Sequence, residues 1–259
     1  MRDRQPGTRT LAAAVLPPAG GAAAVALWWA AVLVFDIPPY VLPTPAAVAR
    51  VFAAMPGELL SQAAVTLGET LAGYGLAVAG GVLGGVAIAG SRTVEQAVYP
   101  LLVALNAAPK AAVVPLLVIW LGFGAAPKVV LAVLFCFFPV TLATAAGLRS
   151  TPAELVELAR SLSASRWQTF AKVRVPAALP QVFVGLKVAL PLAPVGAVVG
   201  ELFAADAGLG YLITASGGTG DVALAFAAVT VLSAMSVVLY AALLAVERLA
   251  LPWLPAVTA

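Results

Sequence analysis

Residues 151–176 read TPAELVELARSLSASRWQTFAKVRVP and form a polar interval between two long apolar segments. The charged residues of this interval are Glu154, Glu157, Arg160, Arg166, Lys172 and Arg174. Charged residues make up only 10% of the whole chain. Because each flanking apolar segment is long enough to cross a bilayer, the pattern predicts a loop that projects from a membrane domain.

The composition predicts an integral membrane protein. Of the 259 residues, 63% are hydrophobic, and a 10% share of charged residues is too small to cover a water-facing surface, where about 25% is usual. The basic residues fall in short loops and form no continuous patch for nucleic acid. Without histidine, and with Cys136 as its one cysteine, the sequence predicts neither a metal site nor a disulfide framework.

Six apolar segments are long enough to be spanning helices, so the expected fold is an all-α integral membrane fold with about six transmembrane helices. They are about Leu11–Phe35, Leu71–Ile88, Val98–Leu121, Val129–Leu148, Gln181–Phe203 and Val222–Val246. A cleaved signal peptide is the alternative interpretation of the first segment. The expected organisation is a tail and first helix over residues 1–35, followed by a core membrane domain over residues 36–259.

The distribution of lysine and arginine predicts that both termini are cytoplasmic. With the N-terminus inside, the inner segments hold Arg2, Arg4, Arg9, Arg92, Arg149, Arg160, Arg166, Lys172, Arg174 and Arg248, and the outer segments hold Arg50 and Lys128. This orientation places residues 151–176 in the cytoplasm.

Two further patterns concern helix ends and helix packing. Thr44 followed by Pro45 is typical of a helix start, so we expect a short helix within the first outer loop. The spacing of Gly80 with Gly84 and of Gly81 with Gly85 indicates close approach of another helix to the second span.

Residues 151–176 predict a helix, a turn and a second helix. Thr151 to Glu154 and Ser165 to Gln168 each match a capping box, and serines break the pattern between them. Leu155, Leu158, Ala159 and Leu162 recur at helical spacing and form one apolar stripe. Pro176 and Pro180 are expected to end the second helix. The loop has no soluble core of its own to bury this stripe, so the pattern indicates a binding partner or the bilayer surface.

These residues resemble the Glu-Ala-Ala signature of ATP-binding cassette importer permeases. Glu157-Leu158-Ala159, Ser163 and the run Val173 to Pro176 have the spacing of that signature, with Leu158 in place of alanine and Ser163 in place of glycine. The segments LPTPAAV, TLGETLAGYGLA and GELFAADAGLGYLI are similar to the nitrate/sulfonate/taurine branch, which includes transporters of thiamine-precursor pyrimidines.

The resemblance implies the type I importer permease fold in a bacterial inner membrane, with residues 151–176 as a docking loop. The docking residues would be Glu154, Glu157, Leu158, Ala159, Arg160, Leu162, Ser163 and Ala164. Two permease copies, as a homodimer, would pair with two ATPase subunits that bind ATP and magnesium and with an extracytoplasmic solute-binding protein. The substrate would be a small anion or a heterocycle. The sequence has no phosphate-binding loop of its own, so it predicts a transport subunit and no enzyme or cofactor site.

Ionisable residues within apolar segments are candidates for a translocation path because burial in a membrane is costly. Lys110 and Glu201 are such candidates, and an ion pair between them is one possibility that the sequence leaves open. Asn106 and Trp120 are further candidates in the third segment, whereas Lys187 is expected to extend toward the cytoplasm. Asp206, Asp221 and the turn Gly208 to Tyr211 fall in the outer loop after the fifth segment. They are candidates for contact with the solute-binding protein or for an outer gate, and a plain surface turn is the alternative.

Two other function classes compete with the importer permease. A stand-alone secondary transporter or channel predicts inverted repeats or several intramembrane acidic residues, and the sequence shows no convincing repeat. A membrane enzyme would need a nucleophile and a base or a metal cluster, which the sequence does not offer.

Overall fold

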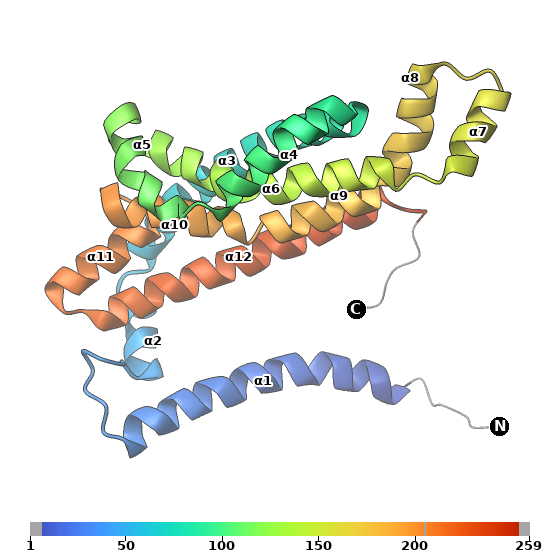
Figure 1. Cartoon of the computed structure of the whole chain (residues 1–259). Coiled ribbons are helices and arrows are strands. Elements are labelled where there is room, and N and C mark those ends of the chain that lie inside the picture. Colours follow the sequence, from blue (N-terminus) through green and yellow to red (C-terminus); the bar gives the residue numbers. More distant parts are fainter. Residues whose placement is uncertain (1–6, 205, 254–259) are drawn as a thin grey trace.

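The computed structural model describes residues 7–204 and 206–253, which form helices joined by short connections with no strand among them (Figure 1). The helices are α1 (Gly7–Val34), α2 (Pro45–Ala54), α3 (Pro56–Gly90), α4 (Arg92–Ala107), η1 (Lys110–Val113), α5 (Val114–Leu121), α6 (Ala125–Arg149), α7 (Ala153–Ser161), α8 (Arg166–Thr169), η2 (Phe170–Arg174), α9 (Val175–Ala189), α10 (Leu192–Ala204), α11 (Leu209–Thr219) and α12 (Val222–Ala250). The expected all-α class is confirmed. Arg2 and Arg4 of the charge count lie outside the described residues.

Four helical segments among the described residues are long and apolar enough to cross a membrane: α3, α6, the stretch Arg166–Phe203 and α12. The pair formed by α4 and η1–α5 adds a fifth if it counts as one span, and α1 adds a helix whose apolar part is Ala19–Val34. Each of the six expected segments therefore corresponds to a helix or to a pair of helices.

The second span begins earlier than the apolar pattern predicts. The expected start was Leu71, whereas α3 begins at Pro56 and runs for 35 residues. Proline at the first turn and Glu58 beside the free amides stabilise a start there. The polar residues Thr66 and Glu69 interrupt the apolar pattern before Leu71, so the sequence predicts a later start. In the structure both side chains are buried against neighbouring helices.

The third expected span is not one helix. α4 and the following pair η1–α5 meet at 87°. The break falls at Pro109, which lacks a backbone N–H, and the preceding Ala108 has an extended backbone (φ −64°, ψ 141°). The chain therefore turns across the bundle at Lys110.

Pro176 and Pro180 do not end a helix, which corrects the expectation for the docking loop. α8 continues through the π-helical turn η2 into α9, where Pro176 lies in the first turn and Pro180 lies inside. A π-helical turn shifts the hydrogen-bond register, so it accommodates the missing N–H of the proline. The docking loop is thus joined to the fifth span by continuous helix.

α6 lies at the centre of the bundle and packs against α3, α9 and α10. Glycines make this packing close: a Cβ on Gly85 would lie 2.8 Å from the Thr141 carbonyl oxygen, and one on Gly196 would lie 2.6 Å from the Ala132 Cα. Gly81 likewise faces Val140. The packing role expected for Gly81 and Gly85 is confirmed.

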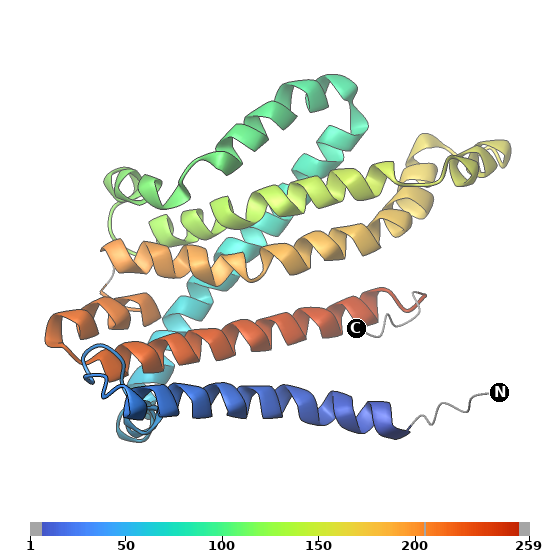
Figure 2. The ribbon, with the colours of Figure 1, turned by 60° about the horizontal axis from the view of Figure 1, so that its bottom comes forward.

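The two ends of the bundle differ. α7 and α8 project from the end at which α1 begins and α12 ends, whereas α2, α5 and α11 lie at the opposite end (Figures 1 and 2). α1 contacts α12 through Trp28, whose ring stacks on Phe226 with centroids 5.6 Å apart. The expected short helix α2 is also present, and the Thr44 hydroxyl accepts a hydrogen bond from the Ala47 N–H.

Candidate functional site

The docking loop forms a pair of short helices with an apolar surface. Leu155, Leu158 and Leu162 on α7 are 45%, 56% and 73% exposed. Ala159, the fourth residue of the predicted stripe, is buried. Trp167 on α8 is also exposed, and its ring centroid lies 5.8 Å from that of Phe170. The stripe is thus a free apolar surface at the tip of the molecule, as a protein-binding loop requires.

One of the two predicted caps is present. The Ser165 hydroxyl accepts from the Gln168 N–H, and the Gln168 side chain accepts from the Ser165 N–H, so this capping box is confirmed. The predicted box at Thr151 is wrong, because the Thr151 hydroxyl donates to the Leu148 carbonyl. α7 instead follows Pro152 and has no side-chain cap.

Ser163 occupies the turn at which the resembling signature has glycine. Its φ is +57°, in the left-handed region. The Ser163 N–H donates to the Arg160 carbonyl, and the Ala164 N–H donates to the Ala159 carbonyl. These two bonds form a Schellman motif, whose left-handed position favours glycine. The serine therefore retains the turn at a conformational cost.

Ser163→Gly is expected to stabilise the docking loop by about 1 kcal/mol, because glycine removes the clash of a Cβ in the left-handed region. Thermal unfolding of the purified chain, or hydrogen exchange of the α7 amides, measures the gain. Ser161→Gly is the matched control, since Ser161 is the last residue of α7 and glycine there should destabilise the helix. Equal effects of both changes would contradict the assignment.

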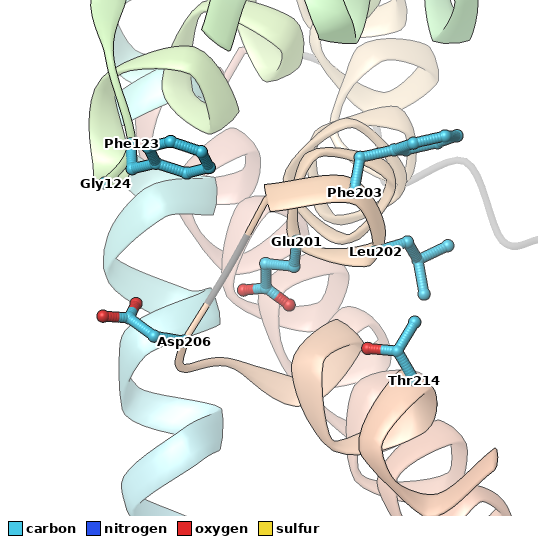
Figure 3. Close-up of a pocket in the computed structure, with 7 residues that line it drawn as sticks. All are labelled: Phe123, Gly124, Glu201, Leu202, Phe203, Asp206 and Thr214. Atoms are coloured by element: carbon cyan, nitrogen blue, oxygen red, sulfur yellow. The ribbon is translucent and has the colours of Figure 1, made fainter. Parts of the chain in front are cut away.

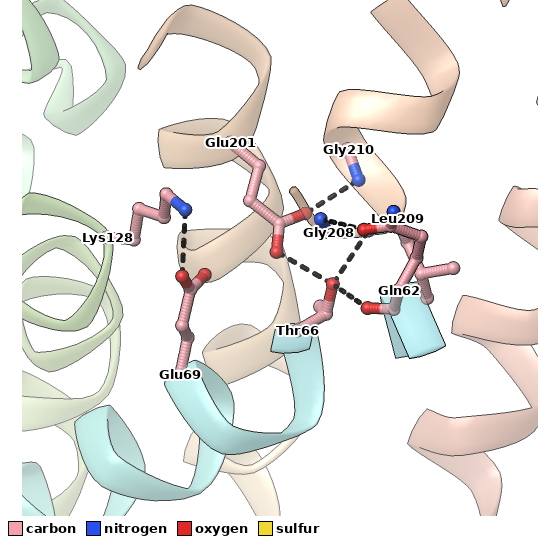
Figure 4. Close-up of polar contacts among 8 residues, drawn as sticks. All are labelled: Gln62, Thr66, Glu69, Lys128, Glu201, Gly208, Leu209 and Gly210. Carbon is pink, nitrogen blue, oxygen red and sulfur yellow. Dashed lines mark hydrogen bonds and ion pairs between the residues drawn. The ribbon is translucent and has the colours of Figure 1, made fainter. Parts of the chain in front are cut away.

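A buried ion pair lies near the end opposite the docking loop. The Lys128 Nζ lies 2.8 Å from the Glu69 Oε1, and the two side chains are 3% and 6% exposed (Figure 4). Lys128 was expected in an outer loop, and this prediction is wrong, because α6 begins at Ala125 and turns the lysine toward α3. The other Glu69 oxygen has no hydrogen-bond partner among the described residues.

Glu201 links three helices next to this pair. Its Oε1 accepts from the Thr66 hydroxyl of α3 at 2.7 Å, and its Oε2 accepts from the Gly210 N–H of α11 at 2.6 Å (Figure 4). Thr66 Oγ1 also accepts from the Leu209 N–H, and the Gln62 side chain accepts from the Gly208 N–H. The first amides of α11 are therefore capped by buried side chains of α3 and α10.

The turn before α11 is built for this carboxylate. Gly208 has φ +111°, and a Cβ there would overlap the Glu201 carboxyl group. Only glycine combines that backbone with so close an approach. The turn from Gly208 to Tyr211 is thus anchored to the bundle by Glu201. The Lys110–Glu201 ion pair considered from the sequence does not form, since Lys110 pairs with Asn106 instead.

A pocket of about 560 Å³ opens beside Glu201. It lies between the connection from α5 to α6, the end of α10 and α11 (Figure 3). Its lining residues are Phe123, Gly124, Glu201, Leu202, Phe203, Asp206 and Thr214. Of the residues predicted for a path, Glu201 lines this pocket, whereas Asn106, Lys110 and Trp120 are absent from its lining.

Lys110 and Asn106 form a separate polar group at the break in the third span. The Lys110 Nζ donates to the Asn106 Oδ1 at 2.9 Å and lies 5.3 Å from the centroid of the Phe135 ring. Phe135 lies on the same helix as Arg149, the last residue of α6. At the helical rise of 1.5 Å per residue, the two residues are about 21 Å apart along the helix axis. The ammonium therefore lies inside the thickness of a bilayer core. Trp120 is on α5 and 68% exposed.

Two further ion pairs, besides that of Lys128 with Glu69, were not predicted from the sequence. The Lys187 Nζ lies 2.8 Å from the Glu247 Oε1, which joins α9 to the last turn of α12. Arg149 pairs with Glu95 and also donates to the Ile88 carbonyl. In both cases the partners come from different helices, so sequence spacing gave no signal for them.

A family model described as "Binding-protein-dependent transport system inner membrane component" matches residues 79–253. The riboflavin transport system permease of Chloroflexus aurantiacus is 38% identical over 86% of this chain and 84% of its own. The formylaminopyrimidine transport permease of Halalkalibacterium halodurans is 36% identical over 83% of this chain and 86% of its own. Other relatives are named as aliphatic sulfonate and taurine permeases.

A solved structure of the MetNI methionine transporter in inward-facing conformations has a chain with a similar fold. The TM-score is 0.61 at 18% identity, over 74% of this chain and 96% of that one. The likeness concerns the arrangement of the spanning helices.

Proposed function

The chain belongs to the family of binding-protein-dependent transport system inner membrane components, and on this premise we propose that it carries a small nitrogen heterocycle across the membrane. It is an importer permease with the type I fold, from the nitrate/sulfonate/taurine branch, in the inner membrane. Beyond this family and fold, we propose the substrate, the arrangement of subunits and the roles of individual residues.

The names of the relatives support the heterocycle. The permeases named for riboflavin and formylaminopyrimidine are 38% and 36% identical to this chain over 86% and 83% of its length. The aliphatic sulfonate permease of Bacillus subtilis is 35% identical over 67%, and the taurine permease of Escherichia coli is 32% identical over 77%. Riboflavin and formylaminopyrimidine are both nitrogen heterocycles. A small anion such as a sulfonate is the alternative substrate.

The exposed leucine surface of α7 is the observation that carries the coupling mechanism. Leu158 and Leu162 are more than half exposed at the tip of the molecule. We infer that a cytoplasmic ATPase subunit covers this surface, with both chain termini on the same side of the membrane. Two copies of the chain and two ATPase subunits would form the importer. ATP and magnesium would then be bound by the ATPase, and the continuous helix from α8 into α9 would transmit its closure.

The group of Lys110 and Asn106 supports a path along α4 and α5. Asn106 is exposed and Lys110 is partly exposed at a depth inside the bilayer core, where a charge facing lipid would cost about 2.5–3.5 kcal/mol. A surface of this kind is stable when it faces a water-filled path or a second copy of the chain. The path would thus be lined by Asn106, Lys110 and Trp120. Glu201 would hold the turn from Gly208 to Tyr211 at the outer end of this path.

Reconstituted transport tests the function. The chain is placed in liposomes with its cognate ATPase and solute-binding protein, and uptake of labelled heterocycle and of labelled taurine is compared. We expect ATP-dependent uptake of the heterocycle and little uptake of taurine. Preferred uptake of taurine would contradict the substrate, and uptake without the ATPase would contradict the mechanism.

Lys110→Met is expected to lower the rate of substrate uptake at least about tenfold, because it removes the charge that lies on the exposed surface within the membrane. The protein should fold normally, since Lys110 makes no buried ion pair. Uptake per folded importer is the measurement. Arg248→Met, at an exposed cation in the last turn of α12, controls for a general effect of lost charge. A rate equal to that of the unmodified importer would remove Lys110 from the path.

A further inference from the structure

A second pocket lies where the docking loop leaves the bundle. It has a volume of about 200 Å³ and is lined by Leu148, Arg149, Thr151, Val156 and Arg174. These residues come from the end of α6, the start of α7 and the turn before α9. Two arginines therefore line one small cavity.

The two arginines have unequal partners. Arg149 pairs with Glu95 and donates to the Ile88 carbonyl, so its position is fixed. Arg174 forms no ion pair with any residue in 7–204 or 206–253. The pocket thus holds more positive charge than the surrounding carboxylates neutralise. Glu154, in the first turn of α7, is exposed and does not line it.

The start of α7 adds to this charge. No side chain caps its first amides, because the Thr151 hydroxyl is turned to the Leu148 carbonyl. Thr151, which lines the pocket, lies two residues before the start of α7, so this uncapped turn lies next to the pocket. Guanidinium groups and free helix amides are both donors that suit a phosphate group.

The pocket lies at the level of a membrane surface. α6 has 25 residues and a length of about 37 Å at the helical rise, which exceeds a bilayer core of about 30 Å. Arg149, its last residue, therefore lies among lipid headgroups. Basic pockets between spanning helices at this depth bind anionic headgroups.

We propose that the pocket binds the phosphate group of an anionic phospholipid. Arg174 and Arg149 hold the phosphate oxygens, and Leu148 and Val156 form the apolar side of the pocket. Because α6, α7 and η2 meet here, a bound headgroup fixes the base of the docking loop relative to the bundle. The anionic lipid content of the membrane would then influence coupling.

Native mass spectrometry tests the site on the full chain. The chain is released from micelles that contain equal amounts of phosphatidylglycerol and phosphatidylcholine, and the retained lipids are counted. We expect a several-fold excess of phosphatidylglycerol, and Arg174→Gln should bring this ratio close to one because a charge-assisted hydrogen bond to the phosphate is lost. Arg166→Gln is the matched control, since Arg166 is exposed on the same loop and does not line the pocket.

Two further measurements complete the test: competition by inorganic phosphate and a second variant. Added inorganic phosphate should leave the retained phosphatidylglycerol unchanged, and its displacement would overturn the lipid as the source of the phosphate. Arg174→Lys, which keeps the positive charge, should lower the ratio less and covers the case in which Arg174→Gln fails to fold. Equal retention of both lipids by the unmodified chain, or equal effects of Arg174→Gln and Arg166→Gln, would overturn the site.

Discussion

Replacing Lys128 by methionine is expected to destabilise the fold by about 3–5 kcal/mol, the cost of leaving a buried partner charge uncompensated. Lys128 and Glu69 are joined at 2.8 Å and almost completely buried. One Glu69 oxygen already lacks a partner among the described residues, so the lysine is the main compensation for that carboxylate. Thermal unfolding in detergent, followed by gel filtration, measures the loss of folded chain.

The double variant Lys128→Met with Glu69→Met separates charge from shape. It removes both charges and keeps apolar volume, so most of the lost stability should return. Lys110→Met is the matched control, because it makes the same substitution at a lysine without an ion pair. Stability of Lys128→Met equal to that of Lys110→Met would show that the pair contributes nothing. Failure of the double variant to recover would assign the loss to packing.

The sequence predicted the spans better than their ends. Apolar length alone located α6 and α12, because both consist of apolar residues between charged ends. It missed the start of α3 because Thr66 and Glu69 look like loop residues until their partners on α10 and α6 are known. Polar residues that pair between helices lower the hydropathy of a segment without making it a loop.

Pairing between helices also explains why the sequence misplaced charged residues. Lys128 follows two glycines and a proline, which favours a loop, and its partner Glu69 lies in another span. A better signal was available, because one acidic and one basic residue in separate apolar segments can cancel each other's burial cost. Distance in sequence gave no way to choose Glu69 over Glu201 as a partner for either lysine.

Local patterns in the docking loop gave mixed results. Ser165 and Gln168 formed their box because both partners lie within one helical turn. The capping box predicted at Thr151 does not form, because α6 ends just before this residue and the Thr151 hydroxyl donates a hydrogen bond to the Leu148 carbonyl. The turn at Ser163 has the left-handed backbone that the glycine of the resembling signature suggested. A cap is therefore predictable when the helix end is free, and less so when another helix ends beside it.

Leu158→Asp is expected to abolish ATP-driven uptake and the co-purification of the ATPase with this chain. Leu158 is 56% exposed at the centre of the α7 surface, so an aspartate there meets water in the free chain and costs little. In the proposed complex the same carboxylate would be buried against an apolar groove without a partner, which costs several kcal/mol. An affinity loss of this size exceeds a factor of about 100.

The control for this change is Leu60→Asp on α3, at the end of the bundle opposite the docking loop. Leu60 is 70% exposed, so the substitution is chemically the same and leaves α7 untouched. Leu60→Asp should retain the ATPase, and Leu158→Met should retain both the ATPase and uptake, because methionine keeps the apolar contact. Retention of the ATPase by Leu158→Asp would show that α7 is not the docking surface. Loss in both aspartate variants would point to misfolding, which equal gel-filtration profiles of the isolated chains would exclude.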